Sequence, residues 1–99
     1  MFARITIGQI APDQETEVAD VIRTTLLPSL RGKPGFEGLT VCGDRASGKG
    51  MALLFFATRE DATRDLMSAD VQQAVREIGS HFTGTPERDT WEVLIDERV

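Results

Sequence analysis

His81 is the residue whose chemistry is most easily named, because it is the only histidine in the chain and histidine titrates near neutral pH. It lies in the stretch SHFTG, which is typical of a helix C-terminus and places it beside the apolar Phe82. A ring turned into a pocket could act as a general base, whereas a ring at the helix end would be an ordinary surface side chain. We predict His81 as a candidate catalytic residue and keep the surface position as the alternative.

Arg4 and Thr6 are the other candidate catalytic residues, because they alternate along an N-terminal strand and share one of its faces. If this face lines a pocket, the Arg4 guanidinium can pair with an anionic or enolate oxygen. If it lies at the rim of a larger assembly, Arg4 would form a salt bridge between subunits. Strand alternation decides which residues share a face, but not which face lines the pocket, so both alternatives stay open.

Several apolar residues are candidates for binding a small apolar substrate. Trp91 could stack on a flat ligand, or it could belong to a core or an interface between chains. The others lie on a predicted strand and on the apolar stripe of the second predicted helix. The predicted substrate-binding residues are Phe56, Leu66, Val71, Val75 and Trp91.

The sequence offers little for a cofactor or a metal ion. A single cysteine and a single histidine argue against a dedicated metal site, and we expect Cys42 to be buried and inert. The stretch GDRASGKG resembles a phosphate-binding loop, but Gly50 stands where Ser or Thr would contact magnesium, and a strand follows instead of a helix. We expect a hairpin turn there, with no cofactor and no metal.

Length and charge limit the possible partners. The 99 residues are enough for one domain, at 1–99. A net charge of −5 without a basic tract argues against nucleic acid and anionic membranes as partners. No apolar run is long enough to span a bilayer, and the N-terminal residues lack the pattern of a signal peptide. We expect a cytoplasmic protein.

Apolar periodicity predicts four strands, at residues 2–9, 36–43, 50–58 and 90–96. The stretch GTPERD, residues 84–89, predicts a loop before the last strand. Helical spacing predicts one helix between the first two strands and a second between the last two. The resulting β-α-β-β-α-β order predicts an α+β, ferredoxin-like fold. Right-handed crossovers would place both helices on one face of a four-stranded antiparallel sheet.

The ends of the helices are suggested by proline and by capping residues. The first helix should open at Pro12 and Asp13, and Pro28 should end or kink it near Leu27. The second should be capped by Thr58. A break in its apolar rhythm predicts a bend around Ser68 to Asp70.

The stretch GMALLFFAT, residues 50–58, does not alternate as a half-exposed strand should. Helices can cover only one of its two apolar faces. Exposing four or five large apolar side chains would forfeit several kcal/mol, at ~1.5–3 kcal/mol each, in a domain with a net stability of ~5–15 kcal/mol. We therefore predict a homodimer in which a second copy packs against the free sheet face.

The chain resembles the dimeric α/β-barrel proteins, and among them the antibiotic biosynthesis monooxygenase-like group. The resemblance covers essentially the whole chain and rests on element order, on KPGFEGL at Lys33 to Leu39, and on SADVQQAV at Ser68 to Val75. It implies an apolar pocket between helices and sheet. It also implies cofactor-independent oxygenation of aromatic phenols or quinols, or heme degradation.

The chain departs from this group at three positions. Thr6 stands near a first-strand Asn of heme-degrading members, Ala57 where many members have Trp, and Asp70 or Val71 where many have His. The chain also lacks Tyr and Asn altogether. The leading hypothesis is a cofactor-independent monooxygenase acting on a small aromatic or polyketide-like substrate. The alternative is a non-catalytic ligand-binding or structural protein of the same fold.

Overall fold

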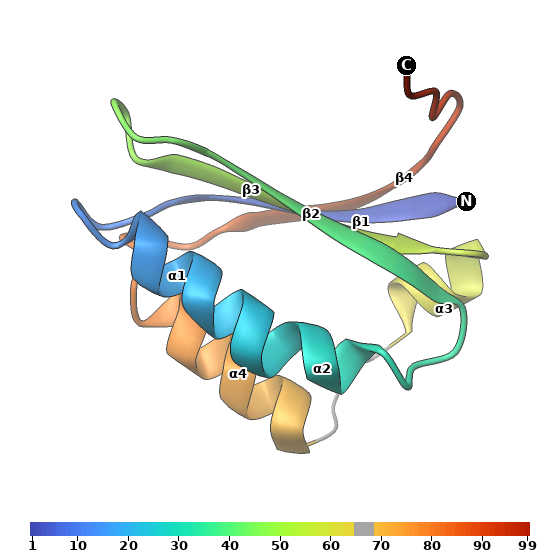
Figure 1. Ribbon diagram of the computed structural model, residues 1–99, viewed down its shortest axis with the longest axis horizontal. Helices are drawn as coiled ribbons and strands as arrows, with labels where there is room; N and C mark the ends of the chain where they lie inside the picture. The colour runs from blue at the N-terminus through green and yellow to red at the C-terminus, as the bar shows by residue number, and fades with distance from the viewer. Residues whose placement is uncertain (65–68) are drawn as a thin grey trace.

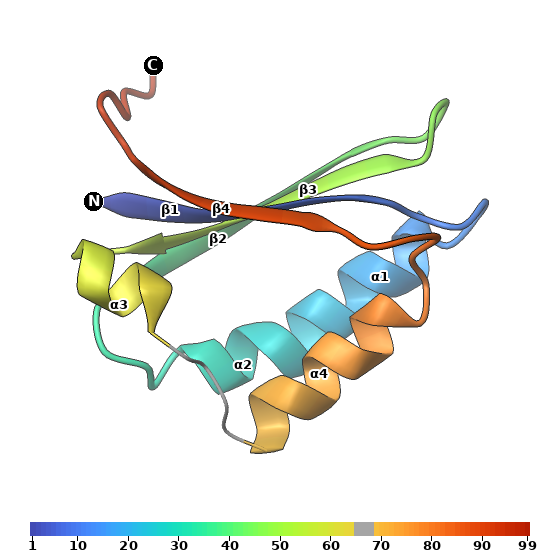
Figure 2. The ribbon, with the colours of Figure 1, turned by 180° about the vertical axis from the view of Figure 1, so that it is seen from behind.

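The structure of the protein is a computed structural model that describes residues 1–64 and 69–99. In this part of the chain, four strands form one antiparallel sheet in the order β2-β3-β1-β4. The helices lie against one face of the sheet (Figure 1, Figure 2). These observations confirm the predicted α+β, ferredoxin-like fold. The strands are β1 Phe2–Gln9, β2 Phe36–Asp44, β3 Lys49–Phe56 and β4 Glu87–Glu92.

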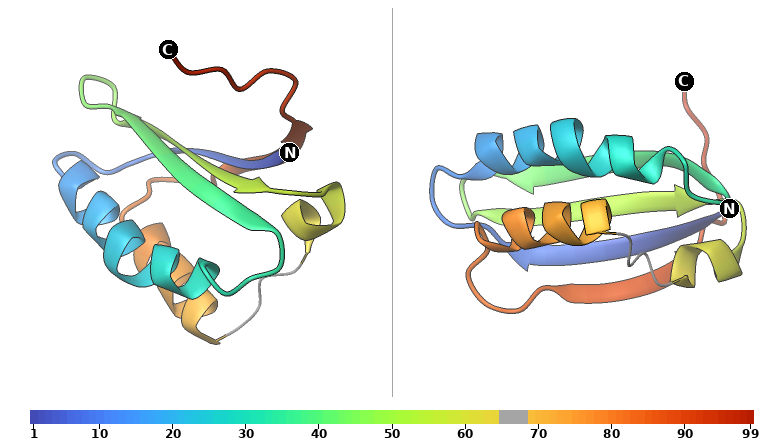
Figure 3. Two further views of the ribbon diagram at one scale, coloured as in Figure 1. Left: turned by 45° about the vertical axis from the view of Figure 1, so that its right-hand side comes forward. Right: turned by 90° about the horizontal axis from the view of Figure 1, so that it is seen from below.

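Two helical segments cover the sheet, one connecting β1 to β2 and one preceding β4. The view from below shows both of them lying over the sheet, roughly along the direction of the strands (Figure 3). In the described residues, no helix has the length and apolar character needed to cross a membrane. The helices are α1 Glu15–Val21, η1 Ile22–Leu26, α2 Leu27–Leu30, α3 Arg59–Thr63 and α4 Ala69–Gly79.

The first helical segment differs from its prediction at both ends. It begins at Glu15, because Asp13 adopts a left-handed φ of 62° in the turn that precedes it. Of the two alternatives predicted at Pro28, an end of the helix near Leu27 is wrong, because helical structure continues to Leu30 with Pro28 in the first turn of α2. Proline has no N–H to donate, and the π-helical turn η1 directly before α2 changes the hydrogen-bonding pattern where that donor would be needed.

The second helical segment begins as predicted, because Thr58 Oγ1 accepts a hydrogen bond from the backbone N–H of Asp61 at 3.1 Å. In the described residues, α3 ends at Thr63 and α4 spans Ala69–Gly79. Of the predicted bend, Ser68 lies outside the described residues, and so does Leu66 among the predicted substrate-binding residues.

The last strand begins three residues before its predicted start and ends four residues before its predicted end. The polar residues Glu87, Arg88 and Asp89, expected in a loop, pair with β1. An edge strand can carry polar side chains on both faces, so its sequence lacks the apolar alternation on which the prediction relied. The chain leaves β4 after Glu92, and the C-terminal residues turn to the side of the sheet opposite the helices (Figure 1).

The hairpin between β2 and β3 is the glycine-containing turn that was predicted in place of a phosphate loop. Asp44 accepts hydrogen bonds from the backbone N–H of Ala46 at 3.1 Å and from Ser47 Oγ at 2.9 Å. Gly48 has a φ of 77°, which favours glycine. The hydrogen bond from Ser47, followed by that from Ala46, lowers the pKa of the Asp44 carboxyl group.

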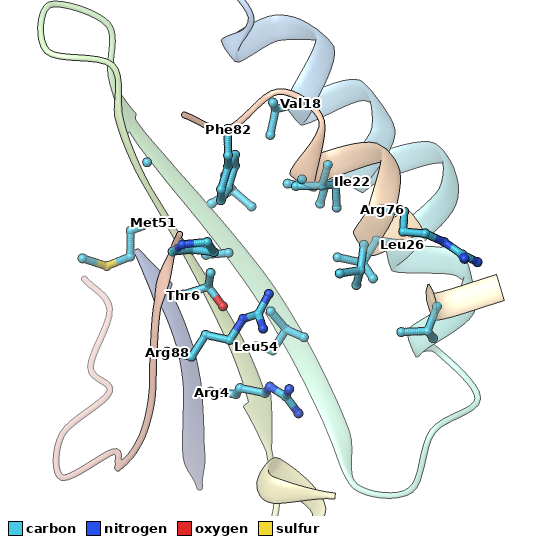
Figure 4. A pocket seen from close by; sticks show the side chains of 18 of the residues that line it. Arg4, Thr6, Val18, Ile22, Leu26, Met51, Leu54, Arg76, Phe82 and Arg88 are labelled. Atoms are coloured by element: carbon cyan, nitrogen blue, oxygen red, sulfur yellow. The ribbon is translucent and has the colours of Figure 1, made fainter. Parts of the chain in front are cut away.

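The two faces of β3 differ in what covers them. Leu54 points to the helices, whereas Met51 points away and is 36% exposed (Figure 4). Leu54 and Phe56 both belong to the buried core. We call the sheet face opposite the helices the open face. Register and alternation place these apolar residues on it: Ala3, Ile5, Ile7, Met51, Leu53, Phe55 and Trp91.

Candidate functional site

A cavity of about 410 Å³ lies between the sheet and the helices. Its helix-side wall is apolar and includes Val18, Ile22 and Leu26 from the first helical segment (Figure 4). Phe82, which follows α4, closes another side and packs close to β1, where a Cβ on Gly8 would come within 2.7 Å of its ring. A cavity of this size and character suits a small, largely apolar ligand.

Arg4, Thr6 and Arg88 supply the polar groups of the sheet-side wall (Figure 4). Thr6 is paired with Arg88 in the register of β1 and β4, which makes Arg4 and Arg88 diagonal neighbours on one sheet face. Arg4 Nη1 donates a hydrogen bond to the backbone carbonyl of Arg64 at 3.2 Å. The face that carries Arg4 and Thr6 is thus the cavity face, and a catalytic role for the two residues stays a prediction.

Helix α4 supplies the wall that faces these residues. Val71 is 3% exposed and Val75 is 42% exposed, so the wall runs from the core to the surface. Gln72 and Arg76 also line it. The predicted substrate-binding residues Val71 and Val75 therefore lie at the cavity together with Arg4 and Thr6.

His81 lies outside the residues that line the cavity. Its ring Nδ1 is hydrogen-bonded to Oε1 of Gln14, and its backbone carbonyl accepts a hydrogen bond from Ala11 N at 2.8 Å. Both contacts tie the end of α4 to the turn before α1. The structure therefore places His81 in a structural contact and does not bring it together with Arg4 and Thr6.

Trp91 lies on the open face, on the opposite side of the sheet from the cavity. It is 59% exposed, and its Nε1 donates a hydrogen bond to Asp89 Oδ2 at 2.9 Å. Phe56 is completely buried and packs edge-to-face on Phe36 with ring centroids 5.7 Å apart. Phe56 belongs to the core and is not among the residues that line the cavity.

Cys42 is exposed, which corrects the expectation that its thiol is buried. It lies on β2, an edge strand of the sheet, where fewer neighbours cover a side chain. Among residues 1–64 and 69–99, no three His, Cys, Asp or Glu side chains gather into a group that could hold a metal ion.

Arg88 is the functional candidate that the sequence-based prediction missed, together with Gln72, Arg76 and Phe82. Arg88 was assigned to a loop, so no sheet face could be given to it. A signal was available in retrospect, because an antiparallel pairing of residues 87–92 with β1 places Arg88 beside Thr6.

Comparison with known proteins gives no matching protein-family model and no match among curated protein sequences. Solved structures do match along nearly the whole chain. A protein proposed to be an antibiotic biosynthesis monooxygenase from Bordetella bronchiseptica superposes with a TM-score of 0.79 at 17% identity, covering 95% of this chain and 97% of that one. One with the same proposed assignment, from Nitrosomonas europaea, gives 0.76 at 14% identity, covering 94% and 89%.

A variant of SnoaB, a cofactor-independent oxygenase from Streptomyces nogalater, also superposes on this chain. Its TM-score is 0.74 at 16% identity, with coverage of 96% of this chain and 94% of that one. These similarities confirm the predicted resemblance at the level of the fold. Because proteins of one fold can differ in activity, what the cavity does depends on the residues of this chain.

Proposed function

We propose that the chain is a cofactor-independent oxygenase that acts on a small aromatic or polyketide-like substrate in the cavity between helices and sheet. The observation that carries the proposal is the cavity itself: about 410 Å³, apolar on its helix side, with Arg4, Thr6 and Arg88 on its sheet side. SnoaB, described as a cofactor-independent oxygenase, shares the fold, which supports the same assignment here.

The proposed reaction requires only the substrate and O₂. In a phenolate, electron density at the carbon para to the oxygen forms a bond with one atom of O₂. Loss of water, with one oxygen from O₂ and both hydrogens from the phenol, then leaves a quinone. The ring loses four electrons and O₂ accepts them. The chain would contribute exclusion of water, cationic groups near the developing charge, and a hydroxyl at Thr6.

Oxygen consumption tests this proposal. We expect the protein to consume O₂ with at least one member of a panel of two-ring and three-ring phenols and quinols, faster than a reaction without protein. Replacing Arg4 with Ala should lower kcat/KM by about 10²-fold, the usual cost of losing a group that stabilises an oxyanion. Arg31→Ala is the matched control, because Arg31 is exposed and lies outside the cavity wall. No consumption across the panel would contradict the proposal.

One observation favours the second candidate, a protein of this fold that binds a ligand without catalysis. Among the described residues that line the cavity, none is His, Cys, Asp or Glu, the usual general bases. Tight binding of an aromatic ligand in the cavity, without O₂ consumption, would establish this second function and exclude the first.

A homodimer is part of the proposal. On the open face, Ala3 and Ile5 are buried within the chain, Ile7, Leu53 and Phe55 are half-buried without cover from the helices, and Met51 and Trp91 are 36% and 59% exposed. Leu94 and Ile95, which follow β4, are 84% and 83% exposed. The C-terminal segment to which they belong turns to the same side of the sheet (Figure 1). Apolar surface of this extent on a small domain favours association. A second copy packed face to face would bury it and leave both cavities intact.

The proposal also includes a cytosolic location. Cys42 is the only cysteine, so the chain cannot form an internal disulfide bond. Internal disulfide bonds are typical of small exported domains, and their absence is compatible with a reducing compartment.

A further inference from the structure

We propose that the cavity selects amphipathic anions, and that Arg88 is the residue that recognises the anionic group. The ligand class is a flat, largely apolar molecule that carries a carboxylate. The inference rests on the proposed function in one respect, because it places the substrate in the same cavity.

The charge of the cavity wall is the first argument. Among the described residues, its charged members are all cationic: Arg4, Arg76 and Arg88. The chain as a whole carries a net charge of −5, with 16 acidic and 11 basic residues. A wall with arginine and without a described carboxylate is therefore opposite in sign to the rest of the molecule. A nearby positive charge stabilises the ionised form of an acidic ligand.

The contacts of the arginines are the second argument. Elsewhere in the chain, Arg23, Arg64 and Arg98 form ion pairs with Asp side chains at 3.3, 3.1 and 3.6 Å. Arg88 forms no ion pair and no side-chain hydrogen bond with the described part of the chain. Its five N–H donors, in a planar fork suited to two carboxylate oxygens, are thus available to a ligand.

Geometry is the third argument. Arg88 extends from β4 toward the space between sheet and helices, beside Thr6 and near Arg4 (Figure 4). The apolar wall formed by Ile22 and Leu26 lies across that space from it. A ligand could place its anionic group at Arg88 and pack its ring system against these residues. It would then pair with the charge and cover the apolar wall. Arg76 also lines the cavity from α4, but its guanidinium points away from the sheet, so Arg88 and Arg4 are the cationic groups on the sheet side (Figure 4).

Matched probes separate charge from shape. 2-Naphthoate and 2-naphthamide have nearly the same size, but only the first is an anion at neutral pH. We expect calorimetric titration of the full chain to show that 2-naphthoate binds at least about tenfold more tightly, since charge-assisted hydrogen bonds are stronger than neutral ones. The preference should decrease as salt is added.

Substitution of Arg88 tests which residue is responsible. Arg88→Gln should abolish the preference by weakening only the binding of 2-naphthoate, with 2-naphthamide affinity unchanged within about twofold. Arg88→Lys should retain part of the preference, because it keeps the charge but loses the fork geometry. Arg31→Gln, outside the cavity wall, should behave as the unchanged protein. Because Arg88 is exposed on an edge strand, these variants should fold, which circular dichroism will check.

Three results would overturn the inference: equal affinity for the two probes, a preference that survives in Arg88→Gln, or no binding of either probe up to millimolar concentration. Its failure is distinguishable from failure of the proposed function. An anion preference without O₂ consumption would leave the inference standing and reject the oxygenase. O₂ consumption without an anion preference would support the oxygenase and reject the inference about Arg88.

Discussion

Trp91 and Asp89 form a specific polar contact on the open face of the sheet. The indole N–H of Trp91 donates to Asp89 Oδ2 at 2.9 Å, and the backbone N–H of Thr90 donates to Oδ1 at 2.8 Å. These two hydrogen bonds, the first with the larger effect, lower the pKa of the Asp89 carboxyl group. The contact gives the only tryptophan a role in the sheet and leaves its ring exposed beside apolar neighbours.

We expect Trp91→Phe to raise the pKa of Asp89 toward its ordinary value of 3.8, because the larger of the two hydrogen bonds is lost. In the unchanged protein the folded-state pKa lies below the unfolded-state pKa. The contribution of Asp89 to stability is therefore present above pH 3.8 and is lost as the pH falls through the lowered folded value. Titration of the carboxyl ¹³C signals by NMR measures the shift.

Asp44 is an internal control in the same titration. Its pKa is lowered chiefly by Ser47, in a turn that Trp91 does not contact, so it should titrate identically in both proteins. An Asp89 titration unchanged by Trp91→Phe would show that the indole hydrogen bond does not form in solution.

For single residues, the sequence predicts which side chains share a strand face better than it predicts which of them line the cavity. Alternation correctly placed Arg4 and Thr6 on one face, and only the structure shows that this face lines the cavity. The sequence did not place Arg88 on a strand, because the residues around it lack apolar alternation. The hydrogen bond between His81 and Gln14 spans 67 positions of the sequence, so no local pattern could have revealed it.

Strand β3 is the element that links the cavity to the proposed dimer. Leu54 and Phe56 face the core, while Leu53 and Phe55 lie on the open face. An element that is apolar on both faces needs cover on both, and the described helices lie on one (Figure 3). We therefore propose that another copy of the chain covers the second face of β3.

Phe55→Glu tests that assignment. Sedimentation equilibrium at micromolar concentration should give the mass of two chains for the unchanged protein and of one chain for the variant, because a charge without a partner is costly to bury at an interface. Val75→Glu is the matched control. It introduces the same charge at a partly exposed valine on the opposite side of the molecule and should leave the dimer intact. A mass of one chain for the unchanged protein would refute the dimer.

The elements themselves were predictable where local chemistry dominates. Apolar periodicity located β1, β2 and β3, and the hydroxyl of Thr58 located the start of α3. The prediction was wrong for β4 because pairing with β1, a tertiary effect, decides its bounds. At Pro28 the prediction left an end and a kink as alternatives, and it did not include the π-helical turn that precedes the continuation to Leu30.

The whole molecule combines an acidic surface with a locally cationic cavity. The net charge of −5 gives an approaching anion no general attraction, so any anion preference must come from groups close to the ligand. The fold supplies the position of the cavity, and the side chains of this chain supply its chemistry. Fold similarity at 17% identity or less does not reveal the chemistry of the cavity, because proteins of one fold can differ in activity.

Oxygen consumption by a cavity-blocked variant tests the central claim most directly. Val75 is partly exposed and lines the cavity, so Val75→Trp should narrow it without disrupting the core. Gln73→Trp introduces the same ring at an exposed position of α4 outside the cavity wall. With the phenol that the unchanged protein oxidises fastest, we expect Val75→Trp to consume O₂ at least about tenfold more slowly and Gln73→Trp to match the unchanged protein. Equal rates in all three proteins would contradict the claim that the cavity between helices and sheet is the site of reaction.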